Sequence, residues 1–311
     1  MSGRFPDSTN GYPMPRRALP TLALALAASL GLSACGAGGG NGDAGGGTAD
    51  AAKPLTVVAD AEPHATLLKQ VEEQGLLGDV DIEVTEIAGG VDPNQLVSGG
   101  DVDVNYFQHT PYLKNWNSEH SAQLQMVGTV HVEPLGLYSR KVSSLQEVPK
   151  GANIAIPADA VNQGRALFLL QEAGLVTLDV QAGDPNLDIA QVTEGNITEN
   201  AQGITFTKID RPQLAASLDD PKVHLSVVNG NYALEAGLKP DQDALILDSV
   251  ANNPYANGIV TRPELVNDPR VVKLTQALQD PKIKQFITDT YAGSVLPAED
   301  GEAAPTGAPT S

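Results

Sequence analysis

The chain has 311 residues, enough for two domains of ordinary size, and a formal net charge of −19 at pH 7. With 38 acidic residues against 19 Lys and Arg, it has no basic patch to neutralise phosphates, which argues against nucleic acid as a partner. At 41% hydrophobic and only 4% aromatic, it can bury a substantial core filled mainly by aliphatic side chains.

Residues 1–34 are expected to be a targeting signal rather than part of the fold. Arg16 and Arg17 form its positive region, and the apolar run 19–32 is shorter than the about 20 residues that span a membrane. Small residues then precede Cys35, the only cysteine of the chain, which therefore has no disulfide partner. The segment resembles a bacterial lipoprotein signal, which implies cleavage before Cys35 and its lipidation, with an amide-linked palmitate or similar chain. The alternative is a plain secretory signal with an incidental cysteine.

Low-complexity segments flank the expected ordered region. Residues 35–53 are mostly Gly, Ala and Asp, and we expect the lipidated cysteine to be followed by a flexible tether there. Residues 297–311 are rich in Pro, Ala, Gly and acid, and we expect a disordered tail.

Between these segments, strand and helix patterns alternate. Strands are expected at 55–60, 81–87, 101–106, 124–132, 153–156, 223–228, 244–247 and 253–262. Helices are expected at 62–77, 93–99, 110–119 and 162–173, after 231, and as a pair within 268–291 broken at Asp280-Pro281. The alternation predicts an α/β fold with a parallel sheet and helices on both faces.

The stretch 101–113 is expected to carry a binding site at a strand–helix junction. Thr110 supplies an N-cap oxygen and Pro111 fits the first helical position, which leaves Phe107, Gln108 and His109 on the connecting loop. In open α/β sheets such loops lie at the carboxyl edge of the strands, where ligands bind. The alternative is an ordinary turn with a core Phe and a surface His.

Arg165 is a second candidate. If Asn162 caps the helix 162–173, Arg165 lies in the first turn, where the helix dipole disfavours a cation. A bound anion between the guanidinium and the free backbone N–H groups would remove this conflict. The alternative is a surface Arg that reaches a nearby acid.

Five segments together resemble the NlpA lipoprotein family, the MetQ-like methionine-binding proteins of ABC importers. They are 107–113, 133–139, 156–167, 231–238 and 253–257. The resemblance implies a bilobed type II periplasmic-binding-protein fold, with two α/β lobes and the ligand in the cleft between them. Residues 54–136 and 246–296 would form lobe 1, and residues 137–245 would form lobe 2.

The resemblance also implies ligand-binding residues, expected at Phe107, His109, Tyr112, Asn162, Arg165, Asn229 and Asn257. Phe107 would form apolar wall for a thioether, and Arg165 would bind the carboxylate of an amino acid. Asn side-chain oxygens can accept hydrogen bonds from its ammonium group.

One position departs from the family pattern. Some members place an aromatic residue three positions before the Pro-Asn that matches Pro93-Asn94, and here that position is Gly90, beside Gly89. One wall of the side-chain pocket would then be missing or replaced, which puts strict methionine selectivity in doubt.

The resemblance implies that the protein captures methionine or a close derivative and delivers it to an ABC permease and ATPase complex. It would be a monomer, lipid-anchored at the extracytoplasmic face of the cell membrane, without a cofactor or metal. Alternatives are another small amino acid, a methionine-containing dipeptide, or a surface lipoprotein without a transport role. An enzyme is disfavoured because the chain has no nucleophile motif or phosphate loop. A zinc-import protein is disfavoured because the five histidines of this chain show no ligand spacing.

Overall fold

The computed structural model describes residues 53–87, 89–249 and 254–298. The expected signal 1–34, the lipidation of Cys35, nearly all of the tether and residues 299–311 of the tail lie outside these ranges. Among the described residues, no helix is both long and apolar enough to cross a membrane.

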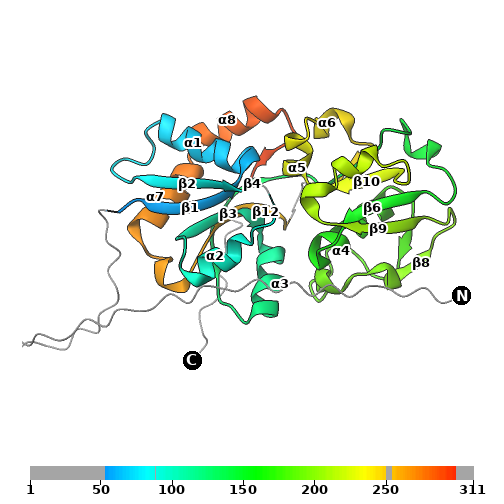
Figure 1. The fold of residues 1–311 in the computed structure, drawn as a ribbon, viewed down its shortest axis with the longest axis horizontal. Coiled ribbons are helices and arrows are strands. Elements are labelled where there is room, and N and C mark those ends of the chain that lie inside the picture. The colour runs from blue at the N-terminus through cyan, green and yellow to red at the C-terminus, as the bar shows by residue number, and fades with distance from the viewer. Residues whose placement is uncertain (1–52, 88, 250–253, 299–311) are drawn as a thin grey trace, which may run out of the picture. The chain divides into compact units, whose positions relative to one another are not determined.

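The first of two large sheets has six strands in the order β13-β4-β12-β3-β1-β2 (Figure 1). They are β1 Leu55–Asp60, β2 Ile82–Ile87, β3 Val104–His109, β4 Gln125–Val132, β12 Ala256–Thr261 and β13 Leu296–Pro297. Strand β1 is parallel to β2 and β3, but β12 is antiparallel to both β3 and β4. The expected parallel sheet is therefore wrong in part, because the chain returns from the second sheet into the middle of the first.

Helices cover both faces of this sheet, as expected. They are α1 Thr66–Glu73, α2 Pro93–Gly99, α3 Thr110–His120, α7 Pro269–Leu278 and α8 Pro281–Tyr291. Neighbouring strand residues point to opposite faces, so Ile259 packs in one core cluster with α1, α7 and α8, whereas Val260 packs in another with α2 and α3. Figure 1 shows α1 beside α8 and α2 beside α3.

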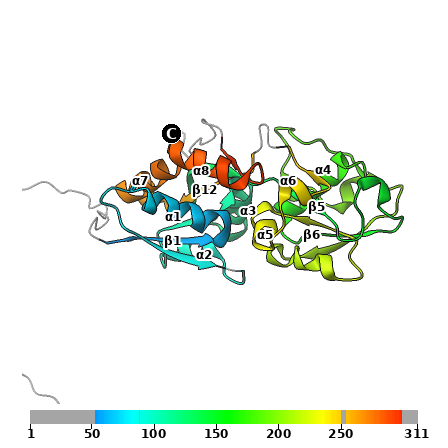
Figure 2. The same ribbon diagram turned by 90° about the horizontal axis from the view of Figure 1, so that it is seen from above.

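The second sheet has five strands in the order β11-β5-β10-β6-β9. They are β5 Gly136–Tyr138, β6 Asn153–Pro157, β9 Thr205–Ile209, β10 Leu225–Val228 and β11 Ile246–Leu247. Helices α4 Ala160–Glu172, α5 Gly230–Glu235 and α6 Pro240–Asp243 accompany it (Figure 2). Strand β7 Thr177–Leu178 pairs with β8 Ile197–Glu199. Its two core clusters are separate from those of the first sheet; one is almost wholly aliphatic, and the other includes Tyr138 and Tyr232.

The chain passes between the sheets twice, from β4 to β5 and from β11 to β12. Gly136 and the two residues of β11 belong to the second sheet, one or two positions beyond the lobe boundaries expected from sequence. At the C-terminal end, Pro297 pairs with His131 in the first sheet, so the expected tail begins inside a strand.

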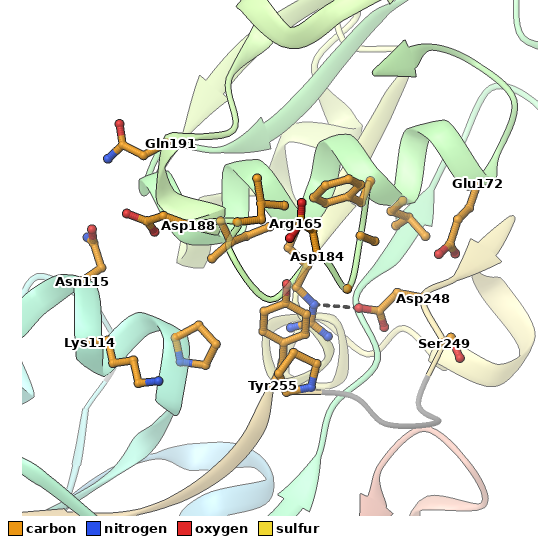
Figure 3. A pocket seen from close by; sticks show the side chains of 18 of the residues that line it. Lys114, Asn115, Arg165, Glu172, Asp184, Asp188, Gln191, Asp248, Ser249 and Tyr255 are labelled. Carbon is orange, nitrogen blue, oxygen red and sulfur yellow. Dashed lines mark hydrogen bonds and ion pairs between the residues drawn. The ribbon is translucent and has the colours of Figure 1, made fainter. Parts of the chain in front are cut away.

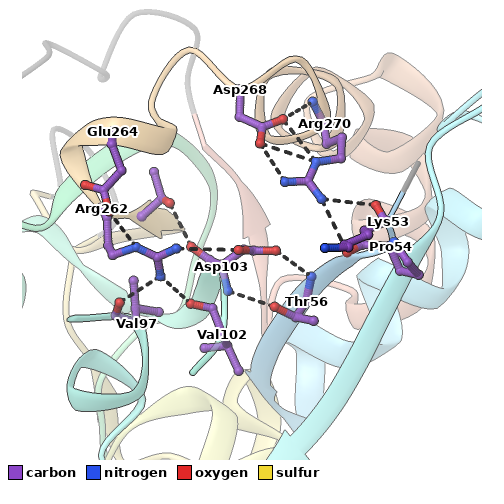
Figure 4. Close-up of polar contacts among 11 residues, drawn as sticks. Lys53, Pro54, Thr56, Val97, Val102, Asp103, Arg262, Glu264, Asp268 and Arg270 are labelled. Carbon is purple, nitrogen blue, oxygen red and sulfur yellow. Dashed lines mark hydrogen bonds and ion pairs between the residues drawn. The ribbon is translucent and has the colours of Figure 1, made fainter. Parts of the chain in front are cut away.

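A network of hydrogen bonds fixes the start of β3 (Figure 4). Arg262 donates to the backbone oxygens of Val97 and Val102 and lies 3.5 Å from Asp103. Asp103 in turn accepts from the backbone N–H of Thr56 on β1. These bonds fix the position of the start of β3 relative to β1, and thereby the position of the buried residues at its carboxyl end.

Candidate ligand-binding site

The junction of β3 and α3 is tighter than the sequence suggested. Strand β3 continues through Phe107 and Gln108 to His109, so these residues are not on a loop. The N-cap of α3 is His109 rather than Thr110, and its Nδ1 accepts from the backbone N–H of Tyr112 at 3.2 Å. All three β3 residues are buried, at 5%, 1% and 4% exposure, so the alternative of a surface His at position 109 is wrong.

Aromatic rings gather at this junction. The Tyr112 ring makes edge contacts with Phe107 and His109, at centroid distances of 5.8 and 6.2 Å. Tyr255, which lies just before β12, contacts His109 at 5.0 Å. Burial, followed by the charges of Arg165 and Arg211, lowers the pKa of His109 to about 3, so its imidazole is neutral.

Asn162 connects the two sheets at this point. Its Oδ1 accepts from Asn229 Nδ2 at 2.9 Å and lies 3.5 Å from His109 Nε2. Helix α4 begins at Ala160 with Asp159 as its N-cap, so the expected cap at Asn162 is wrong. Asn162 is instead free to point inward, and its Nδ2 donates to Asp159 Oδ1. Within the described part of the chain, Asn229 Oδ1 is buried without a hydrogen-bond partner.

Arg165 lies in the second turn of α4, not the first, and it is already paired. Its Nε donates to Asp248 Oδ2 at 2.6 Å (Figure 3), and Nη2 donates to the backbone oxygen of Glu133 at 2.9 Å. The guanidinium stacks on the Tyr255 ring, 4.2 Å from its centroid. The alternative was a surface Arg that reaches a nearby acid; the acid is present, but the Arg165 side chain is buried. Its Nη1 makes no hydrogen bond among the described residues.

A cavity of ≈990 Å³ lies next to Arg165, between α3 and α4 (Figure 3). Its lining includes Lys114 and Asn115 from α3, Phe168 from α4, and Asp248 and Tyr255. Arg165 is the only expected ligand-binding residue in this lining. Five of the others are buried, at most 7% exposed, and Tyr112 is half-buried; the five are Phe107, His109, Asn162, Asn229 and Asn257.

Asn257 is brought to the same region by β12. In the two ladders of that strand it is opposite His109 of β3 and His131 of β4. The structure therefore gathers the expected residues from both sheets around the β3–α3 junction, with Tyr255 between them and the cavity.

A second buried cluster, which sequence spacing did not predict, lies beside Asn257. His64, His131 and Glu133 bring one ligand-type atom each to within 4.8 Å of one another. Glu133 Oε1 accepts from His131 Nε2 at 2.7 Å, and Oε2 accepts from the backbone N–H of Asn231. Burial raises the pKa of Glu133, but His64 and His131 outweigh it and bring the value to about 2. The carboxylate thus ties α5 to the end of β4.

Two charged residues that sequence reasoning missed complete the region. Asp60, at the carboxyl end of β1, is 3% exposed and accepts from Asn231 Nδ2 at 3.0 Å. Arg211, which follows β9, lies over the Tyr112 ring and 3.4 Å from Asp159. Asp60 ends the expected strand 55–60, which was the available signal for it. No strand was expected before Arg211, and spacing along the chain does not place Arg211 opposite Tyr112.

Two α/β sheets joined by two crossings, with polar side chains from both meeting between them, define a periplasmic-binding-protein fold. Residues 55–299 of the chain match the NlpA lipoprotein family. The chain belongs to that family, and it is a binding protein rather than an enzyme.

Relatives and solved structures agree with this assignment. Methionine-binding lipoprotein MetQ of Bacillus subtilis is 34% identical over 256 residues, 82% of this chain and 91% of that protein. A nutrient binding protein from Burkholderia cenocepacia, solved bound to methionine, has a TM-score of 0.73 at 34% identity, covering 79% of this chain and all of that one. An ABC transporter periplasmic substrate-binding protein from Coxiella burnetii has a TM-score of 0.71 at 34% identity over 78% of this chain and 100% of that chain.

Proposed function

We propose that this protein is the substrate-binding lipoprotein of an ABC importer and captures a free α-amino acid, methionine or a close derivative. Cys35 would carry the lipid anchor and hold a monomer at the extracytoplasmic face of the membrane. The protein would deliver its ligand to a permease and ATPase complex. Support comes from a relative named as methionine-binding, a related structure solved with methionine, and a third described as an ABC transporter component.

The observation that carries the proposal is the unpaired oxygen of Asn229. Its Oδ1 is buried, has no hydrogen-bond partner in the described ranges, and belongs to an amide held in place by Asn162. An unsatisfied buried acceptor is costly, so a donor such as an ammonium group is expected beside it. The Nη1 of Arg165 remains for a carboxylate, and Phe107 with Tyr112 offers apolar wall to the side chain.

Isothermal titration of L-methionine tests this assignment. We expect binding to the wild type and a loss of about tenfold or more in affinity for Asn229→Ala, because the amide that accepts from the ammonium is removed. Asn186→Ala, an exposed position in the second-sheet region, should bind as the wild type does. Absence of heat with every free amino acid would contradict the proposal.

The alternative ligands are another small amino acid or a methionine-containing dipeptide. The alternative function is a surface lipoprotein without a transport role. A dipeptide has its carboxylate farther from its ammonium, so it would bind without the full dependence on both Asn229 and Arg165 that a single amino acid should show.

A further inference from the structure

A short 3₁₀ turn, η5 Arg211–Gln213, follows β9. It lies beside Gly89, next to the position where Gly90 replaces the aromatic residue of some family members. A Cβ added at Gly90 would meet nothing within 4 Å, but one added at Gly89 would lie 3.2 Å from Pro212 Cγ. The Gly89–Gly90 turn therefore packs against the residue next to Arg211. Where some family members have an aromatic residue, this chain has no side chain at Gly90, and η5 is the element beside the turn.

Arg211 places its charge directly on an expected pocket wall. Its Cζ lies 4.7 Å from the centroid of the Tyr112 ring, a cation–π distance. The contact joins the two sheets, since Tyr112 belongs to α3 and Arg211 follows β9. Tyr112 also contacts Phe107, so the guanidinium group of Arg211 lies next to the two aromatic residues expected to contact the ligand's side chain.

The donors of this guanidinium are largely unused. Arg211 carries five N–H donors, and its side chain is only 18% exposed. Its nearest acid is Asp159, 3.4 Å from Nε, and no hydrogen bond from Arg211 is found within the described ranges. Charge-assisted hydrogen bonds are the stronger kind, so these donors favour an acceptor oxygen on the ligand. A thioether sulfur is only a weak acceptor.

The charges nearby favour a neutral oxygen over a carboxylate. Asp159 lies 3.4 Å from the guanidinium Nε. A ligand with a second carboxylate would meet repulsion from Asp159, whereas a neutral oxygen would accept from Arg211 without it.

We propose that Arg211 is a specificity-determining residue that binds a neutral acceptor oxygen at the end of the ligand's side chain, as in a sulfoxide or a carboxamide. This inference rests on the proposed function, because it takes an α-amino-acid head group as bound near Asn229. With Arg211 in this role and no aromatic residue at position 90, the protein would prefer ligands whose side chain has a short apolar stem and a polar end.

Titration with L-methionine, L-methionine sulfoxide, L-glutamine and L-glutamate tests it. The wild type should bind the sulfoxide or glutamine about tenfold or more tighter than methionine, and glutamate more weakly than glutamine. Arg211→Leu should lose that preference, so that the sulfoxide and glutamine bind no tighter than methionine, because the guanidinium donors are removed. Arg140→Leu, at an exposed Arg that follows β5 and pairs with Asp219, should keep the wild-type order.

The outcomes separate the two proposals. If methionine binds the wild type tighter than both the sulfoxide and glutamine, the inference is wrong and the proposed function stands. If the preference exists but survives in a folded Arg211→Leu, Arg211 is not its source. If no amino acid binds, the proposed function fails and this inference fails with it. The wild-type order of affinities decides the matter even where the variant does not fold.

Discussion

Arg165 and Asp248 form a nearly buried ion pair of 2.6 Å that links the middle of α4 to the segment after β11. The second carboxylate oxygen of Asp248 accepts from the backbone N–H of Leu135, between β4 and β5. One carboxylate therefore holds both crossings between the sheets, and Arg165 supplies its counter-charge. Arg165 is thus part of the folded framework before any ligand arrives.

Arg165→Ala should lower the free energy of unfolding by about 3–5 kcal/mol, because it leaves a nearly buried carboxylate without its partner. Urea denaturation followed by circular dichroism measures this. Arg140→Ala breaks the exposed Arg140–Asp219 pair and should cost at most about 1 kcal/mol. Equal losses in the two variants would show that the Asp248 pair has no special role.

The carboxyl of Asp60 gives stability a predicted pH dependence. Burial raises its pKa from 3.8 to about 7, and the nearby Arg211 only partly opposes this, while Glu133 and Glu235 add to it. Between about pH 4 and 7 the folded protein holds a proton that the unfolded chain has released, so stability falls as pH rises through this window.

Asp60→Asn should remove that loss. Between about pH 5 and 8 the wild type should lose on the order of 2–3 kcal/mol of unfolding free energy more than the variant does. Urea titrations at the two pH values test this, and Asp241→Asn, at an exposed acid on α6, is a control. Parallel pH profiles for wild type and Asp60→Asn would overturn the assignment.

Gly90 has a φ of +72°, which L-residues other than Asn and Asp rarely adopt. Gly90→Tyr should therefore fold but lose about 1–2 kcal/mol, although a Cβ there meets no atom within 4 Å. Gly90→Asn should lose less, because Asn tolerates a left-handed backbone. Thermal melts of the three proteins check this order. Equal melting temperatures for the Tyr and Asn variants would show that the turn relaxes.

Cys35→Ala should move the protein from the membrane to the soluble fraction. Stable anchoring requires about two acyl chains, and the only cysteine is the expected site for them. Fractionation of cells expressing the wild type or the variant, with immunodetection, measures the shift. A variant that remains with the membrane would disprove lipidation at this residue.

Local patterns predicted most of the fold. The Asp92-Pro93 start and Gly99-Gly100 end of α2, and the Asp280-Pro281 break between α7 and α8, are where composition placed them, because caps and prolines act on nearest neighbours. The antiparallel placement of β12 was missed, since its partners are some 150 residues away and alternation says nothing of direction. Strand β9 was missed for a different reason: its residues are only half-buried or exposed, so their sequence lacks a clear apolar pattern.

For the site, the resemblance named residues that the structure gathers, and their roles as ligand contacts remain predictions. Physical reasoning from the sequence erred where a more distant partner decided the outcome. Asp248, 83 positions from Arg165, neutralises it, and Asp159 caps α4 in place of Asn162. No short-range pattern reveals that Arg211 lies on Tyr112, because the contact exists only once the two sheets meet.

The central claim is that an α-amino acid occupies the space around Asn229 and Arg165. Mass spectrometry of small molecules released when the purified protein is denatured tests it without any choice of ligand. The account predicts one amino acid, methionine or an oxygen-bearing relative, in an amount comparable to the protein and strongly reduced in Asn229→Ala. A protein that releases no amino acid, and whose melting temperature then shifts with none of the twenty amino acids or methionine sulfoxide, would contradict it.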